Sequence, residues 1–132
     1  MKYACCDCSN LFEIDLASTS NVEDMSYTFY GSGTKNITGL DTSSVKNLDG
    51  AFAKSLVTNL ILDCSKVTSA KGTFTDCLYL SELTLKNVSD SGILTALVTS
   101  LPIVEAGTIT LENCTTTAEI NTIATEKGWT VQ

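Results

Sequence analysis

The stretch NVEDMSYTFYGS, at Asn21–Ser32, has two later counterparts: SVKNLDGAFAKS at Ser44–Ser55 and KVTSAKGTFTDC at Lys66–Cys77. Each copy has a Val, an apolar or small residue three positions later, and a Phe four positions after that. Spacings of three and four are typical of one face of an amphipathic helix. The Phe residues lie 23 and 22 residues apart, and a fixed period of this length indicates a repeat protein. We therefore predict that equivalent residues of successive copies pack on one another.

A second pattern, L-x-L, lies between these copies, in FEIDL, NLILD, ELTLK and TITLE. Alternation with a period of two predicts a half-buried strand. The second unit departs from the pattern, because NITGLD offers Leu40 as one inward residue and leaves Thr38 or Ile37 for the other. Each unit is predicted to be a short strand, a turn and a helix of two to three turns. A further helix is expected around Ser91–Leu101, ended by Pro102.

A single α/β domain over residues 1–132 follows from this pattern, with repeats of about 22–24 residues at 8–107. The stacked units are expected to place short parallel strands on one face and helices on the other, as in a solenoid. Residues 108–132 are predicted to form a strand–helix–strand cap, with a Thr116-x-x-Glu119 capping box and a stop at Gly128. No comparable cap is seen before Cys8, so a missing upstream region, another chain or self-association is predicted to cover that end.

The phrases LDTSSVKNLDGAF, NVEDMSYTFYGS and FTDCLYLSELTL resemble the BspA-like leucine-rich repeats. They are closest to the D-T-S-x-V-x-N-M type found in mycoplasma and gut-bacterial surface lipoproteins and in phage proteins. The resemblance covers about residues 8–97 and implies a leucine-rich-repeat solenoid with a role in surface recognition or adhesion. It implies no catalytic residues, because the repeated positions are core positions.

Composition argues against several functions. The net charge is −7, and all eight basic residues are scattered Lys, which is unlike a nucleic-acid-binding surface. The absence of His excludes Ser-His-Asp and Cys-His catalytic arrangements, and no phosphate-binding glycine motif occurs. We therefore expect no enzyme activity and no cofactor. No segment is long and apolar enough to span a membrane, and MKYACCDCSNLF lacks the apolar core of a signal peptide.

Six Cys residues leave three interpretations open. An even number is compatible with a disulfide framework, but the spacings are irregular. Cys5, Cys6 and Cys8 resemble a soft-metal cluster but lack a matching partner motif, so no metal is assigned. The interpretation favoured here is that the thiols fill small core positions.

The outward face of the strands is the predicted binding surface. Its second-unit positions are placed at Ile37, Gly39 and Asp41, and short parallel strands bring such side chains into columns about 5 Å apart. This largely anionic face suits a basic or hydroxyl-rich ligand or a cation, whereas the alternative is a solvated face that prevents sheet pairing. The candidate ligand-binding residues are Glu13, Asp15, Asp41, Asn59, Asp63, Glu82, Lys86 and Glu112.

Two functions are compatible with this prediction. The first is a non-catalytic recognition or adhesion module of a bacterial surface or secreted protein, which binds protein or glycan through the strand face. The second is a structural or host-binding component of a bacteriophage virion, in the tail, fibre or capsid. The expected location is accordingly the bacterial cell surface, the extracellular space or the virion, with no nucleic-acid partner and no membrane insertion.

Overall fold

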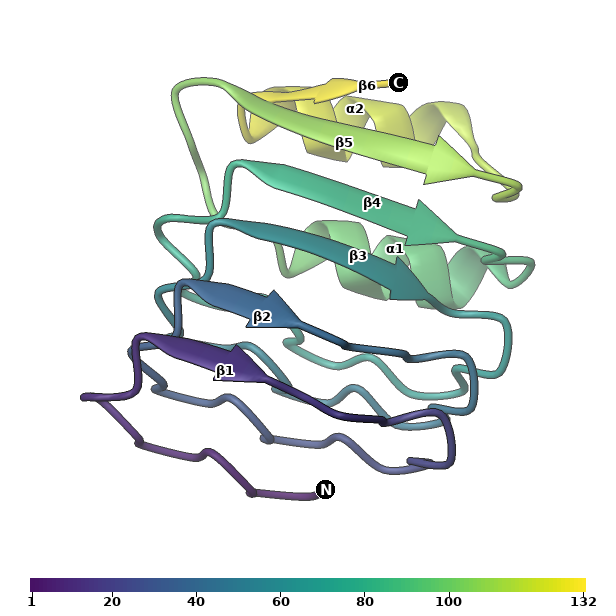
Figure 1. Cartoon of the computed structure of the whole chain (residues 1–132). Helices are drawn as coiled ribbons and strands as arrows, with labels where there is room; N and C mark the ends of the chain where they lie inside the picture. Colours follow the sequence, from purple (N-terminus) through teal and green to yellow (C-terminus); the bar gives the residue numbers. More distant parts are fainter.

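The computed structural model describes all residues, 1–132, and is an α/β structure of parallel strands with two helices (Figure 1). The strands form two sheets, one with the order β1-β2 and one with the order β3-β4-β5-β6. This confirms the α/β class and the parallel strands. The strands are β1 (Glu13–Asp15), β2 (Asn36–Thr38), β3 (Asn59–Asp63), β4 (Glu82–Lys86), β5 (Gly107–Glu112) and β6 (Trp129–Val131). The helices are α1 (Ser91–Thr99) and α2 (Ala118–Glu126).

The register of the larger sheet aligns the L-x-L patterns. Leu60 pairs with Leu83, which pairs with Ile109, and Leu62 is likewise followed by Leu85 and Leu111. Leu62, Leu85 and Ile109 are fully buried, so the inward positions predicted for these strands are confirmed. Burial of such aliphatic side chains supplies roughly 1.5–3 kcal/mol each.

The predicted helices at 21–32, 44–55 and 66–77 are wrong, because these stretches form successive tight turns instead. Within the first stretch, the Thr28 N–H donates to the Met25 carbonyl, as in a tight turn. Alternate N–H groups donate to the next unit instead: Tyr27 to Asp49, and Phe29 to Ala51. An α-helix would consume these groups internally, so bonding between units replaces helical bonding.

Left-handed backbone conformations recur at matching places in the turn segments. Tyr27, Gly50 and Gly72 have φ of 54°, 57° and 61°, and four residues later Gly31, Lys54 and Asp76 have φ of 63°, 59° and 57°. Such residues are incompatible with a continuous α-helix. The apolar residues spaced three and four positions apart are nevertheless buried together, because a series of tight turns also has one side that faces the core.

Aromatic stacking connects the turn segments. The ring centroids of Phe29 and Phe52 are 5.5 Å apart, those of Phe52 and Phe74 are 6.2 Å apart, and both pairs are stacked. All three Phe side chains are fully buried. The predicted contact between equivalent aromatic residues of successive copies is therefore confirmed.

Helices α1 and α2 lie behind the larger sheet (Figure 1). Helix α1 matches the prediction at 91–101, and the Asp90 carboxylate accepts hydrogen bonds from its first turn. The strand–helix–strand order of residues 108–132 is also observed. The predicted capping box is wrong in detail: Thr117, not Thr116, is the N-cap, and its side chain accepts from the Ile120 N–H. Glu119 is then only the second helical residue, one short of the position that a capping box requires.

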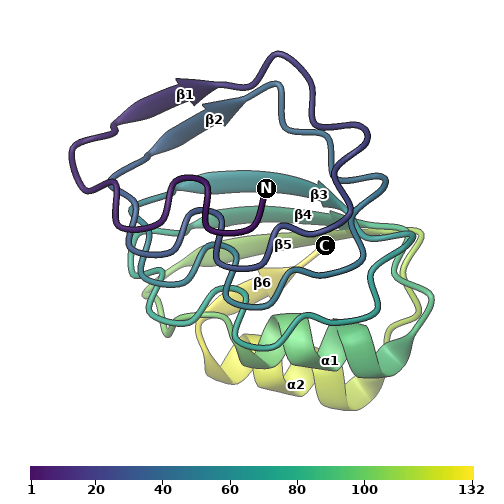
Figure 2. The same ribbon diagram turned by 90° about the horizontal axis from the view of Figure 1, so that it is seen from below.

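The sheet breaks between β2 and β3 because the units differ in length by one residue. On the entry side, Lys35 bonds to Phe12 and Thr58 bonds to Lys35, each 23 residues apart. After the strands, Thr19 bonds to Asp41 across 22 residues, but Thr42 bonds to Asp63 across only 21. The stretch from Asn36 to Asp41 therefore has one residue more than its counterpart in β3. Figure 2 shows β1 and β2 standing away from the plane of β3–β6.

Candidate functional site

The strand face carries most of the predicted binding residues. Glu13, Asp15, Asn59, Glu82 and Glu112 are exposed on their strands. Asn59 pairs with Glu82 in one row across the sheet. Lys86 pairs with both Asp63 and Glu112 in another. The structure thus brings residues from β3, β4 and β5 together, while Glu13 and Asp15 lie on the separate β1-β2 sheet.

The outward positions predicted for the second unit are wrong. Ile37 pairs with Ile14 and is half-buried, so the outward residues of β2 are Asn36 and Thr38. Gly39 follows the strand with φ of +72°, which lets the chain insert its extra residue. The extra residue moves the alternation by one position, so reading the unit by analogy with β3 placed the wrong side chains outward.

Asp41 lies in the turn after β2, not on the strand. Its Oδ1 accepts hydrogen bonds from the Ser43 N–H at 2.9 Å and the Ser43 hydroxyl at 2.6 Å. These two bonds hold the pKa of Asp41 below its usual value. One oxygen of this carboxylate is therefore engaged in the turn, off the strand where the prediction placed Asp41.

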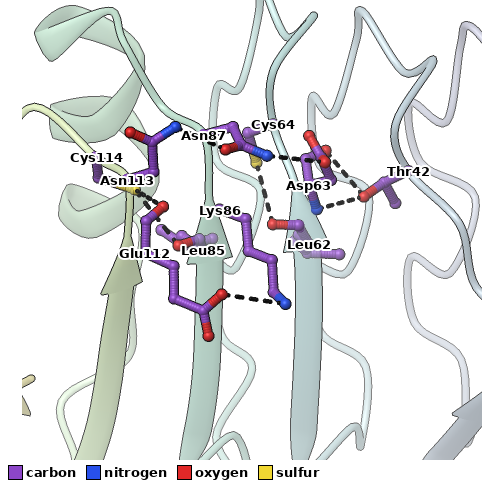
Figure 3. A network of polar contacts seen from close by, with 10 residues as sticks. All are labelled: Thr42, Leu62, Asp63, Cys64, Leu85, Lys86, Asn87, Glu112, Asn113 and Cys114. Atoms are coloured by element: carbon purple, nitrogen blue, oxygen red, sulfur yellow. Dashed lines mark hydrogen bonds and ion pairs between the residues drawn. The ribbon is translucent and has the colours of Figure 1, made fainter.

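Asp63 is likewise a structural carboxylate (Figure 3). Burial would raise its pKa, but hydrogen bonds from the Ser65 N–H and the Asn87 amide outweigh burial and lower it. The Asn87 Nδ2 donates to Asp63 Oδ2 at 3.0 Å, and the Asn113 Nδ2 donates to Asn87 Oδ1 at 2.9 Å. This row of side chains ties the ends of β3, β4 and β5 together. Sequence reasoning missed Asn87 and Asn113, although both follow an L-x-L strand at equivalent places.

Lys86 and Glu112 neutralise each other on the strand face. Their charged atoms are 3.1 Å apart, and both side chains remain well exposed (Figure 3). Exposed pairs of this kind contribute about 0–1 kcal/mol to stability. The anionic character of the face therefore comes mainly from Glu13, Asp15 and Glu82.

A groove lies at the step between β2 and β3. Its volume is about 330 Å³, and an adjoining hollow of about 560 Å³ extends it over β1 and β2. Ile61 is one of its lining residues and is 63% exposed. The groove is lined by Ile37, Gly39, Leu40, Asn59, Leu60, Ile61, Glu82 and Thr84. The hollow is lined by Glu13, Ile14, Asp15, Asn36, Ile37, Thr38 and Asn59.

This groove collects four of the predicted residues and adds others that sequence reasoning missed. Glu13, Asp15, Asn59 and Glu82 line the groove or the hollow, and no Lys does. The hollow adds Asn36 and Thr38 of β2, which the prediction had not placed on the outward face. The change of period from 23 to 22 residues was the signal that could have located the step.

All six thiols are free, and no disulfide is present. Burial raises the pKa of Cys64 to about 12 and that of Cys77 to about 11, so both are protonated at neutral pH. Cys5, Cys6 and Cys8 do not gather with other metal-binding side chains into a group of three or more that could hold an ion. Buried core thiols match the favoured sequence interpretation for Cys64 and Cys77.

The comparisons with known proteins identify no relative: no protein-family model, curated protein or solved structure matches the chain. Neither α1 nor α2 has the length and apolar character that a bilayer-spanning helix needs. The strand face and its groove therefore provide the basis for a functional proposal.

Proposed function

We propose that the protein is a non-catalytic recognition or adhesion module that binds protein or glycan through its strand face. The observation that carries this proposal is the combination of exposed carboxylates with a hollowed surface. Glu13, Asp15 and Glu82 line the groove and hollow, where no basic side chain opposes them. Concave surfaces with a few convergent polar groups are the usual places for ligands.

The proposal includes a specific type of α/β fold. The unit spacing, the parallel strands and the stacked Phe residues support a leucine-rich-repeat solenoid of the BspA-like type. Such solenoids stack units that cannot bury their apolar faces alone and present an extended surface for partners. A bacterial surface or secreted protein would use this surface for adhesion.

Two sets of substitutions test whether binding depends on the strand face or on the rest of the surface. The triple variant Glu13→Gln, Asp15→Asn and Glu82→Gln removes three carboxylates from the face. The matched control, Glu105→Gln, Glu119→Gln and Glu126→Gln, removes three exposed carboxylates elsewhere. On glycan arrays and bacterial or host-cell protein arrays, we expect the first triple to weaken wild-type binding by about tenfold or more and the control to leave it unchanged. Equal behaviour of the two triples would contradict the proposal.

A structural or host-binding component of a bacteriophage virion is a second candidate. It is favoured by exposed aromatic residues at the β1 end, where Phe12 is 60% and Tyr3 is 53% exposed. Tyr3 stacks on Tyr27 at 5.3 Å, so its ring is held in place rather than free. Light scattering over a range of concentrations tests whether this end assembles with a second copy: assembly that Phe12→Glu abolishes supports a structural role, and a monomer at every concentration contradicts self-assembly through this end.

A further inference from the structure

The facing edges of β2 and β3 carry main-chain groups that no neighbouring strand satisfies. Asp63 directs both its N–H and its carbonyl to the Thr42 hydroxyl, on the β2 side. Because main-chain groups alternate sides along a strand, Ile61 presents its N–H and carbonyl to the same opening. On β2, the Thr38 carbonyl accepts from the Leu16 N–H, so the groups of Ile37 face the opening. No ladder joins the two strands.

Hydrogen bonds at both ends hold this opening in place. At the entry, the Thr58 N–H donates to the Lys35 carbonyl at 3.3 Å. At the exit, the Thr42 hydroxyl bonds to the main chain of Asp63 at 2.9 and 2.8 Å. The four residues 59–62 lie between these ends. At roughly 3.3 Å per residue, the opening accommodates about four residues of extended chain. A groove formed before the ligand arrives lowers the cost of binding.

Side chains around the opening combine an apolar floor with negative charge. Ile37, Leu40 and Ile61 provide apolar surface, and Glu82 lies at the margin. Glu13 and Asp15 extend the negative charge over the adjoining hollow. A partner that complements this groove has apolar side chains, positive charge and main-chain donors and acceptors together.

We propose that the step between β2 and β3 binds an extended polypeptide segment in which Lys or Arg alternates with apolar residues. The segment pairs with the free main-chain groups of Ile37 and Ile61, as in strand addition to an exposed sheet edge. Its apolar side chains cover Ile61, and its cation lies near Glu82. A glycan matches the carboxylates but has no apolar side chains to fill the floor. This inference rests on the proposed function, because it specifies the ligand class of the same strand face.

A display library of random heptapeptides tests the inference on the full chain. We expect wild-type protein to enrich sequences in which Lys or Arg alternates with apolar residues. Ile61→Lys places a cation on the floor at an exposed position, and we expect it to weaken the enriched peptides by about tenfold or more. Methylation of the peptide's central amide nitrogens should weaken binding similarly, because it removes main-chain donors.

Controls make the result specific to the step. Thr130→Lys introduces the same side chain at an exposed position of β6, on the same face, and should leave binding unchanged. Glu82→Lys is a second variant at the margin and should reproduce the loss. Thermal unfolding of each variant shows whether it is folded, and Glu82→Lys keeps the test decisive if Ile61→Lys does not fold.

The possible outcomes distinguish failure of this inference from failure of the proposed recognition function. Enriched peptides that bind Ile61→Lys and Glu82→Lys as tightly as wild type would overturn the inference. So would a library that yields no enrichment. If glycans then bind and depend on Glu13, Asp15 and Glu82, the recognition function stands with a different ligand class. If neither arrays nor library yield a face-dependent ligand, the proposed function fails as well.

Discussion

At the scale of single residues, Gly39 lies where the chain leaves β2, next to the break in the sheet. Its φ is +72°, and a Cβ at this position would meet the main-chain carbonyl of Leu16. Both the left-handed conformation and the close approach require glycine. Gly39 therefore absorbs the extra residue of the second unit while the β1-β2 pairing continues beside it.

Gly39→Ala is expected to lower the free energy of unfolding by about 1–3 kcal/mol, through an unfavourable φ and a backbone clash. Gly72→Ala is a matched control, because its φ is also positive, at +61°, but its Cβ would approach only the flexible Thr75 side chain. We expect Gly72→Ala to cost clearly less in urea unfolding. Equal costs would show that the approach of Leu16 is not a constraint.

The buried thiols determine how stability changes in alkaline solution. Burial raises the pKa of Cys64 to about 12 and that of Cys77 to about 11, from 9.0 for an ordinary thiol. Above pH 9 the unfolded chain loses these protons while the folded chain keeps them. Stability from this source is complete below pH 9 and is lost as the pH rises toward the folded-state values.

We expect the unfolding free energy of the wild type to fall by about 1.4 kcal/mol per pH unit per thiol above pH 9, relative to Cys64→Ala/Cys77→Ala. Comparison with this double variant cancels the Lys and Tyr titrations that the two proteins share. Urea unfolding at pH 8 and at pH 10.5 measures the difference. Parallel pH profiles for the two proteins would rule out protonated buried thiols.

At the scale of elements, the turn segments form a layer whose stability comes from stacking. Phe52 lies between Phe29 and Phe74, and all three rings are buried. The Phe29 N–H donates to the Ala51 carbonyl and the Phe52 N–H donates to the Thr73 carbonyl, so side chains and main chain connect the same neighbouring segments. The segments are therefore expected to be stable only together.

Phe52→Ala is expected to cost about 3–5 kcal/mol of stability, because it removes the middle ring and leaves a cavity on both sides. Phe12→Ala is the control: Phe12 is 60% exposed, so its loss should change stability by about 0.5 kcal/mol or less. Thermal or urea unfolding compares them. Similar costs would mean that the stacked column is not a stabilising unit.

At the scale of the whole molecule, the step between β2 and β3 divides the strand layer into two sheets. The main-chain groups of Ile61 face the opening, whereas Cys64 donates to Lys86 and so places the even-numbered residues of β3 in the ladder with β4. Neighbouring amides of β3 are thus expected to differ in their protection from hydrogen exchange. This division is what makes the groove available to a ligand.

Hydrogen exchange followed by NMR is expected to show the division directly. The Ile61 amide should exchange about a hundredfold faster than the Leu62 amide, because only the latter lies in a ladder. Leu85, in the middle of the larger sheet, is an internal reference for full protection. If Ile61 were as protected as Leu62, β2 and β3 would be paired in solution and the groove closed.

Much of the fold could be predicted from the sequence because burial follows local pattern. The L-x-L alternation located β1, β3, β4 and β5, and the period of three and four identified Met25, Phe29 and Phe52 as buried. The prediction failed in the three turn segments, where the apolar pattern is compatible with two structures. The same apolar spacing suits a helix and a series of tight turns, and Gly31, Gly50 and Gly72 were the available warning against a helix.

The candidate site could be predicted only in part. Exposure of Glu13, Asp15, Asn59 and Glu82 followed from alternation, which depends only on neighbouring residues. The roles of Asp41 and Asp63 did not, because capping depends on which turn groups lie within hydrogen-bonding reach. The Asn87–Asn113 contact joins residues 26 apart, so only the stacked units bring it together.

The sequence by itself determined most of the apolar side chains that are buried, where the strands lie and that the units repeat, since these depend on hydrophobic periodicity. The tertiary structure decided the rest. Turns replaced helices in the first three units because their N–H groups find carbonyls in the next unit. The sheet opened between β2 and β3 because one extra residue cannot be matched across a ladder that is fixed at both ends.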